Sequence, residues 1–193
     1  NVHLINFGTD TLKFNPEKKD HSLKTRIGFD ADVKLIISLR ALKPIYDIST
    51  FINAIPEVIR SYTKARFVVV GSGEEEEKLK QLAMNLEISK YVHFAGRLSD
   101  EDMQRYTASA DIYVSTSLSD GGLAASTAEA MASEVPVVIS DFGDNREWVE
   151  NGKSGFLFPL KDHKRLAEKI LYLLNNPDTA KKTAKAGRDI IEN

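Results

Sequence analysis

The feature that most constrains the fold is a regular alternation of two kinds of segment along the chain. Short apolar runs rich in β-branched residues alternate with longer segments whose apolar residues recur every three or four positions. The expected strands span residues 33–39, 66–70, 91–94, 111–115, 135–139 and 155–158, and the expected helices span residues 47–63, 74–86, 100–107, 123–133, 161–174 and 178–192. Parallel strands need crossover connections, and strands covered on both faces are apolar throughout. The pattern therefore predicts an α/β fold with a doubly wound, Rossmann-like parallel sheet.

The two ends of the chain differ from this central pattern. Residues 1–32 hold one extended run at 2–7, followed by a charged and turn-rich segment, and we expect an interdomain linker with a leading strand. Residues 33–176 are expected to form the Rossmann-like domain. Residues 177–193 start a C-terminal helix that looks truncated, with Ile190 and Ile191 left without apolar partners. The whole is predicted to be one domain of a longer protein.

Composition excludes several classes of function. The chain has 26 Lys and Arg against 28 Asp and Glu, a net charge of −2, which gives no electrostatic case for binding nucleic acid. It has no cysteine, so disulfides, thiolate nucleophiles and Cys-ligated metals are excluded. The longest apolar runs fall well short of the roughly 20 residues that cross a bilayer. With no secretory signal visible either, a cytoplasmic location is the default expectation.

Ligands of open α/β sheets bind beyond the carboxyl ends of the strands, so the loops that follow the strands are the candidate site. The loop at 115–122 is rich in hydroxyls and glycine and leads into a helix of small residues. The free amides of Gly121, Gly122 and Leu123 are expected to bind a phosphate at this helix N-terminus. The alternative is that Ser119 or Asp120 simply caps the helix.

Three charged residues are candidates for the same crevice. Glu129 lies about two turns into the small-residue helix, among positions expected to be buried, and an unpaired buried carboxylate is costly. It is expected either to accept hydrogen bonds from a sugar diol or to form a buried ion pair with a neighbouring cation. Arg40 and Lys43 follow the first strand and could neutralise a diphosphate, or could be two solvated cations on a loop.

Other motifs are weaker signals. Gly71 and Gly73 resemble the start of a dinucleotide-binding fingerprint, but the third glycine is missing and four glutamates follow. Asp30 and Asp32 have the spacing of a metal-binding pair but precede their strand, at the wrong end of the sheet. The four histidines are scattered without ligand spacing, and there is no phosphate-binding loop of the Walker type. No metal and no cofactor are expected.

Several segments together resemble one known family. They are residues 6–14 (NFGTDTLKF), 67–73 (FVVVGSG), 92–97 (VHFAGR), 129–132 (EAMA) with 135–138 (VPVV), 145–149 (NREWV) and 152–155 (GKSG). In order and spacing they are similar to motifs of the C-terminal domain of retaining glycosyltransferases of family four, which have the GT-B fold. The resemblance covers nearly the whole chain.

The resemblance implies that the site binds a nucleotide-activated sugar with a UDP, GDP or ADP carrier. Glu129 would bind the ribose hydroxyls, and the donor would also contact Gly71, Gly73, Arg97 and Leu98, the last two framing the base. The family has a second carboxylate, separated from the first by seven residues. That position is Gly121 here, so the nearest acid, Asp120, is one residue displaced.

The resemblance also implies the catalytic groups and the reaction. Arg40 matches the arginine of the family's phosphate clamp, whereas the clamp lysine aligns with Tyr46, so that Lys43 would have to substitute. Similar enzymes transfer the sugar without a metal and with retention of anomeric configuration. Arg40, Lys43 and the amides at the helix N-terminus would then stabilise charge on the leaving phosphate, with Asp120 beside the sugar.

The resemblance further implies a partner and a location. The acceptor would bind to an N-terminal domain that this chain lacks, so the isolated chain should transfer little or nothing. The acceptor is expected to be lipid-linked or a polysaccharide, with the complete enzyme cytoplasmic and peripheral to the membrane. Two other functions stay open: a GT-B sugar-nucleotide epimerase, and a non-catalytic module that has kept the fold and lost the site.

Overall fold

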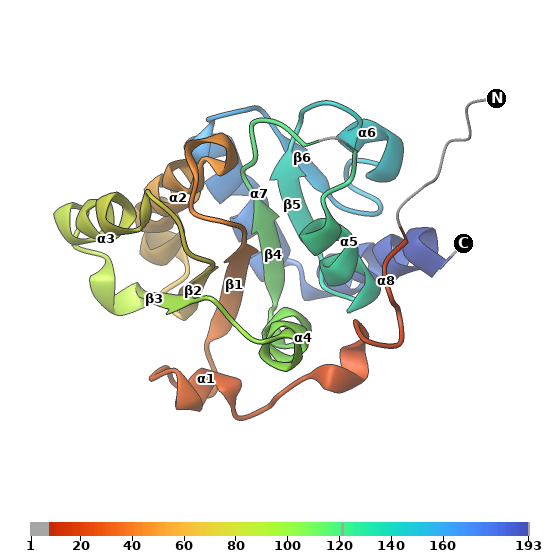
Figure 1. Cartoon of the computed structure of the whole chain (residues 1–193), viewed down its shortest axis with the longest axis horizontal. Coiled ribbons are helices and arrows are strands. Elements are labelled where there is room, and N and C mark those ends of the chain that lie inside the picture. The colour runs from red at the N-terminus through yellow and green to blue at the C-terminus, as the bar shows by residue number, and fades with distance from the viewer. Residues whose placement is uncertain (1–7, 121, 193) are drawn as a thin grey trace.

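The computed structural model describes residues 8–120 and 122–192, and its centre is a six-stranded parallel sheet (Figure 1). The strands are β1 (Lys34–Leu39), β2 (Ala65–Val70), β3 (Val92–Gly96), β4 (Ile112–Ser115), β5 (Val137–Ser140) and β6 (Phe156–Phe158). Their order in the sheet is β3-β2-β1-β4-β5-β6, and all described pairings are parallel. The predicted doubly wound α/β fold is confirmed. The extended run predicted at 2–7 lies outside the described residues.

Helices cover both faces of the sheet. They are α1 (Leu23–Arg26), α2 (Ile48–Ser61), α3 (Glu76–Asn85), α4 (Asp100–Ser109), α5 (Ala125–Ala132), α6 (Asn145–Trp148), α7 (His163–Asn175) and α8 (Pro177–Glu192), with 3-10 turns η1 (Pro16–Lys18), η2 (Pro44–Tyr46) and η3 (Ser89–Tyr91). Buried residues of α2, α3 and α7 form one core cluster with the sheet, and those of α1, α4 and α5 form a second. Figure 1 shows α4 and α5 in front of the sheet and α7 behind it.

The apolar strands supply both core clusters because successive side chains point to opposite faces. In β1, Ile36 packs in the cluster with α2, whereas Leu35 and Ile37 pack in the cluster with α4 and α5. All three side chains are fully buried. Burying one such side chain contributes about 1.5–3 kcal/mol to folding. This two-sided burial is the reason that the strands read as continuous apolar runs.

The segment before β1, which belongs to the residues 1–32 expected to form an interdomain linker and leading strand, packs against the sheet. Leu23 of α1 is fully buried in the second core cluster. The Nζ atom of Lys24 donates to the carbonyl of Val33 at 2.7 Å and to Oδ2 of Asp111 at 2.9 Å. Asp111 also accepts from Nζ of Lys34 at 2.9 Å and from the amide of Leu35. Buried apolar area and this charged cluster therefore attach the segment to the amino ends of β1 and β4.

The C-terminal helix is also part of the packed fold. The chain breaks between α7 and α8 at Asn176, as the sequence predicts, and α8 then packs against α5. A Cβ atom at Gly187 of α8 would lie 3.5 Å from Cγ of Met131 in α5 and only 3.0 Å from the carbonyl oxygen of Ser154, just before β6, so glycine lets α8 lie close to both. Ile191 packs against the second core cluster, while Ile190 stays exposed. Of the two isoleucines expected to lack partners, one therefore has them.

The strand order reverses between β1 and β4. β1 pairs with β2 on one side and with β4 on the other, so the connections that leave these strands diverge to opposite faces. The loops after β1, β2 and β4 therefore enclose a crevice at the carboxyl edge of the sheet. In the described part of the chain, none of the helices combines the length and the apolar character that a membrane span requires.

Candidate functional site

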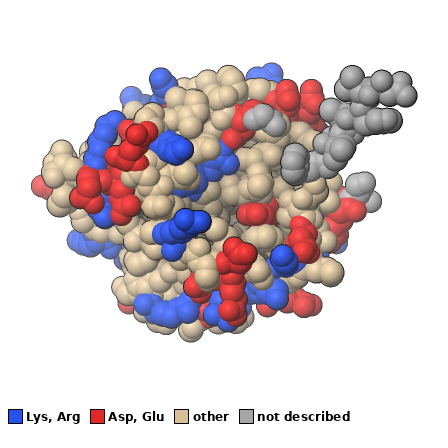
Figure 2. Space-filling view, in the orientation of Figure 1, with Lys and Arg blue, Asp and Glu red and all other residues tan. Residues whose placement is uncertain are grey.

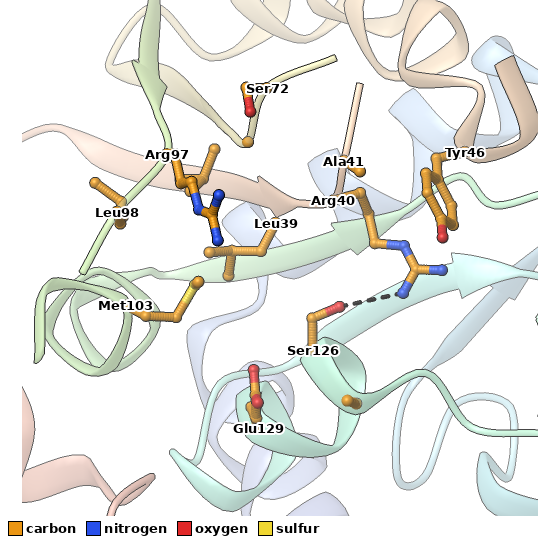
Figure 3. A pocket seen from close by; sticks show the side chains of 13 residues that line it. Leu39, Arg40, Ala41, Tyr46, Ser72, Arg97, Leu98, Met103, Ser126 and Glu129 are labelled. Atoms are coloured by element: carbon orange, nitrogen blue, oxygen red, sulfur yellow. Dashed lines mark hydrogen bonds between the residues drawn. The ribbon is translucent and has the colours of Figure 1, made fainter. Parts of the chain in front are cut away.

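A pocket of about 500 Å³ lies in this crevice. It is lined by Leu39, Arg40, Ala41, Tyr46, Val70, Gly71, Ser72, Arg97, Leu98, Met103, Ala125, Ser126 and Glu129. The space-filling view shows this face hollowed near its centre, with basic side chains on one side of the hollow and acidic side chains on the other (Figure 2). In Figure 3, Arg40 points into the pocket from the loop after β1 and Glu129 from α5, and Arg97, Leu98 and Met103 line the opposite side.

Two glycines bring the loops after β1 and β2 into contact. Gly71 has a φ of +129°, and a Cβ atom there would lie 2.0 Å from the carbonyl oxygen of Arg40. A Cβ atom at Gly73 would lie 2.2 Å from the carbonyl oxygen of Leu42. Only glycine fits either position. Gly71 lines the pocket and Gly73 does not, so Gly73 shapes the loop from outside the pocket wall.

Arg40 is the most constrained charged side chain of the site. Its side chain is 10% exposed, and its Nη2 atom forms an ion pair with Oδ1 of Asp120. The two terminal nitrogens also donate long hydrogen bonds of 3.4 Å to the hydroxyls of Ser126 and Ser117. The guanidinium carbon lies 4.3 Å from the centroid of the Tyr46 ring, and the buried Nε has no hydrogen-bond partner among the described residues. A buried guanidinium with an unused donor indicates an anion-binding position.

The N-terminus of α5 opens into the same pocket. The helix begins at Ala125, two residues later than predicted, and its N-cap residue Ala124 provides no side-chain hydrogen bond. The alternative in which Ser119 or Asp120 caps the helix is therefore wrong; Asp120 pairs with Arg40 instead. Gly122 has a φ of +101°, Leu123 packs against the second core cluster, and Gly121 lies outside the described residues. The amides of Thr127 and Ala128 donate to the carbonyl of Ala124, whereas those of Ala125 and Ser126 remain available for an anion.

Glu129 faces Arg40 across the pocket and has no protein partner of its own. Within residues 8–120 and 122–192, neither an ion pair nor a side-chain hydrogen bond joins it to another residue. Burial, and secondarily the negative charge of Asp100, raises the pKa of its carboxyl above the ordinary value. The alternative of a buried ion pair is therefore wrong for the described residues. A half-buried carboxylate with unused acceptors indicates a ligand that donates hydrogen bonds, such as a diol.

The remaining predicted residues are distributed around the pocket. Arg97 and Leu98 follow β3, whose last residue Gly96 has a φ of +65°, and both line the pocket. Asp120 does not line the pocket and is connected to it through its ion pair with Arg40. Lys43 is exposed at the start of η2 and does not line the pocket.

The pocket also contains residues that the sequence did not single out as contributors. Tyr46 stacks on Arg40 at the position where the motif comparison expects a lysine. Ser126 hydrogen-bonds Arg40 and the hydroxyl of Tyr113, and Met103 closes the wall below Leu98. The tyrosine at the expected lysine position could have identified Tyr46 as a site residue from the sequence. No sequence feature could have identified Ser126, because one serine in a helix of small residues forms no distinctive pattern.

The comparison with known families agrees with this geometry. The model of the family "Glycosyl transferases group 1" matches residues 20–190. The chain belongs to the group 1 glycosyltransferases. A relative from Corynebacterium glutamicum, named GDP-mannose-dependent monoacylated alpha-(1-6)-phosphatidylinositol monomannoside mannosyltransferase, is 31% identical over 96% of this chain and 50% of its own length. The putative glycosyltransferase EpsD of Bacillus subtilis is 28% identical over 97% of this chain and 48% of its own length.

Solved structures show that this group 1 glycosyltransferase chain has the fold of the C-terminal half of a GT-B enzyme. HepE from Anabaena superposes with a TM-score of 0.85 at 23% identity, over 96% of this chain and 50% of that one. The C-terminal domain of the group 1 glycosyltransferase LpcC from Francisella tularensis superposes with a TM-score of 0.82 at 20% identity, over 96% of this chain and 97% of that one. The chain spans about half the length of the curated relatives it matches.

Proposed function

We propose that this chain is the donor-binding domain of a retaining, metal-independent glycosyltransferase that uses a nucleoside diphosphate sugar. The observation that carries the proposal is the arrangement across one pocket of Arg40, with its unused buried donor, and Glu129, with its unused acceptors, beside the uncapped N-terminus of α5. A diphosphate would bind to Arg40 and to the N-terminus of α5, and a ribose diol would donate hydrogen bonds to Glu129. A nucleoside diphosphate contains both groups and can therefore bind all three elements of the site.

The pocket is divided in a way that fits such a donor. The diphosphate would lie between Arg40 and the first turn of α5, where a guanidinium and backbone amides stabilise negative charge. The ribose would lie against Glu129, and the base against Arg97, Leu98 and Met103 on the far wall. The sugar would then extend toward the loop that carries Asp120.

The proposed chemistry is positioning and charge stabilisation. As the bond between the anomeric carbon and the phosphate oxygen breaks, negative charge grows on the leaving diphosphate, and Arg40 and the α5 amides stabilise it. The acceptor hydroxyl would attack from the face that the diphosphate leaves, which retains the configuration. Lys43 would reach the diphosphate only by a movement of the turn that carries it, so Arg40 is the principal cation.

Relatives support the donor class and suggest the acceptor. The C. glutamicum relative is named as GDP-mannose-dependent and as acting on a phosphatidylinositol mannoside. The structure of TarM from S. aureus, 25% identical with a TM-score of 0.76 over 82% of this chain and 32% of that one, was determined with UDP bound. We propose a lipid-linked acceptor held by a second domain, with the complete enzyme in the cytoplasm at the membrane surface. The chain by itself would bind the donor and transfer no sugar.

Calorimetric titration with GDP, UDP and ADP in turn tests the donor site. One of the three should bind, and Arg40→Ala should weaken that binding at least tenfold through loss of a charged donor. Glu129→Gln should weaken binding of both the nucleoside diphosphate and the corresponding nucleoside, because Glu129 is proposed to bind the ribose that both contain. Arg165→Ala, which removes an exposed guanidinium of α7, is the matched control. Unchanged affinity in both site variants would reject the proposal.

A further inference from the structure

Ser126 carries a hydroxyl that contacts two polar side chains of the site. It lies in the first turn of α5 and lines the pocket. Its Oγ is 2.8 Å from the hydroxyl oxygen of Tyr113 and 3.4 Å from Nη1 of Arg40. Tyr113 is fully buried in β4, and Ser126 is partly buried. In Figure 3, the hydroxyl of Ser126 stands between the guanidinium of Arg40 and the carboxyl of Glu129.

What each group can donate sets the direction of some of these bonds. A guanidinium only donates, so Ser126 accepts from Arg40. The hydroxyl of Thr127 donates to the Tyr113 oxygen at 3.5 Å, and Ser115 also hydrogen-bonds the Tyr113 side chain. Between Tyr113 and Ser126, either hydroxyl can be the donor. Burial raises the pKa of Tyr113, so its phenolic hydrogen is retained at ordinary pH. When Tyr113 donates that hydrogen to Ser126, the serine accepts two hydrogen bonds, and its own hydrogen is left to donate.

Ser117 shows the contrasting case on the same guanidinium. Its hydroxyl also accepts from Arg40 at 3.4 Å, but it donates its hydrogen to the carbonyl of Ser119 at 3.1 Å. Ser117 does not line the pocket. Two serines thus contact one arginine, and Ser126 is the one of the two that lines the pocket.

We propose that Ser126 donates this hydrogen to a phosphate oxygen of the ligand, and that Tyr113 is the positioning residue that directs it. The inference rests on the proposed function and adds two residues to it. An anion held by Arg40 and the α5 amides lies within reach of a hydroxyl in the same helical turn. When Tyr113 and Arg40 both donate to Ser126, the serine hydrogen is directed toward the bound phosphate.

The test compares variants of these serines with phosphorylated and unphosphorylated ligands. Ser126→Ala should weaken binding of the nucleoside diphosphate and of inorganic pyrophosphate about tenfold, as expected for one hydrogen bond to a charged acceptor. The nucleoside without phosphates should bind with unchanged affinity. Ser126→Thr keeps a hydroxyl and should stay within about threefold of the wild type. Ser117→Ala removes only a contact to Arg40, so its loss should remain below about threefold.

Tyr113→Phe isolates the positioning role. Without the phenolic hydrogen, Ser126 can turn its own hydrogen toward the protein, so diphosphate affinity should fall about threefold while nucleoside affinity holds. When Tyr113→Phe is combined with Ser126→Ala, diphosphate affinity should fall no further than in Ser126→Ala alone, because the serine hydroxyl that Tyr113 directs is absent. Circular dichroism melting confirms that each variant folds.

The outcomes separate this inference from the proposed function. A wild-type chain that binds neither nucleoside diphosphate nor pyrophosphate overturns both. Binding by the wild type with equal affinity in Ser126→Ala overturns only the role of Ser126. An equal loss for diphosphate and nucleoside assigns Ser126 to the shape of the pocket and also overturns the inference.

Discussion

Asp120 and Arg40 form an ion pair in which both side chains are largely buried, with 17% and 10% of their surfaces exposed. The same Arg40 is the principal cation proposed for the donor diphosphate. The Asp120 carboxylate and a phosphate are therefore competitors for one guanidinium.

The competition predicts that Asp120→Asn tightens nucleoside diphosphate binding. The amide keeps the size of the side chain and removes the negative charge, so the dissociation constant should fall about fivefold. Asp144→Asn, an exposed acid that precedes α6, is the matched control. Calorimetry measures both. Weaker binding in Asp120→Asn would mean that the carboxylate orients Arg40 for the phosphate.

Tyr46 is expected to support Arg40 through its ring. The guanidinium carbon lies 4.3 Å from the ring centroid, a contact worth about 0.5–2 kcal/mol when partly desolvated. Tyr46→Ala should therefore weaken diphosphate binding about 3- to 30-fold. Tyr46→Phe keeps the ring and should bind like the wild type. A loss in the phenylalanine variant as large as in the alanine variant would assign the effect to the hydroxyl.

Glu129→Gln should raise stability while it lowers affinity. The pKa of Glu129 is raised, chiefly by burial, so its ionised form destabilises the fold. This penalty is absent below the unfolded pKa and is fully present above the folded pKa, so stability falls as pH rises between them. The melting temperature of the variant should exceed that of the wild type at pH 8, and the two should converge near pH 4. A difference that is independent of pH would contradict this explanation.

Asp111 is expected to make stability depend on pH in the opposite sense. Burial alone would raise the pKa of Asp111, but the amide of Leu35 and the ammonium groups of Lys24 and Lys34 lower it below the ordinary value. The stabilisation is present above the unfolded pKa and is lost as pH falls through the folded pKa. Asp111→Ala should reduce the free energy of unfolding at pH 7 by about 2–3 kcal/mol.

Urea unfolding at pH 7 and pH 3 tests the role of Asp111. The difference between variant and wild type should shrink at the lower pH, where the carboxylate begins to protonate. Asp32→Ala is the control, because Asp32 pairs with Lys64 on an exposed part of the surface. The effect of Asp32→Ala on the free energy of unfolding should be small, because water screens an exposed ion pair. Equal losses in the two variants would contradict a special role for Asp111.

Glu134 occupies a backbone position at which glycine should make the fold more stable. It follows α5 with a φ of +54°, its amide donates to the carbonyl of Met131, and the amide of Val135 donates to that of Ala130. This is the kind of helix end that favours glycine. Glu134→Gly should stabilise the chain by about 0.5–1 kcal/mol, as measured by urea unfolding. Glu87→Gly, at the same kind of position after α3 with a φ of +56°, should behave alike.

The sequence determined the sheet, its crossover helices and the location of the site, because each depends on local periodicity. Continuous apolar runs such as β1 have few alternatives to burial on both faces, and the order of strands and helices then places the ligand loops at one edge. Arg40 and Glu129 could be selected for the same reason. One follows a strand directly, and the other is a charge among small residues.

Tertiary structure decided the partners of these side chains. Whether Asp120 caps α5 or binds Arg40, whether Glu129 finds a cation, and which serine contacts both Arg40 and Tyr113 all depend on contacts between residues 13 to 86 positions apart. The packing of Leu23 and Lys24 against the sheet is of the same kind. Periodicity records which face of an element is buried, whereas a hydrogen bond depends on the positions of single atoms brought together by the whole fold.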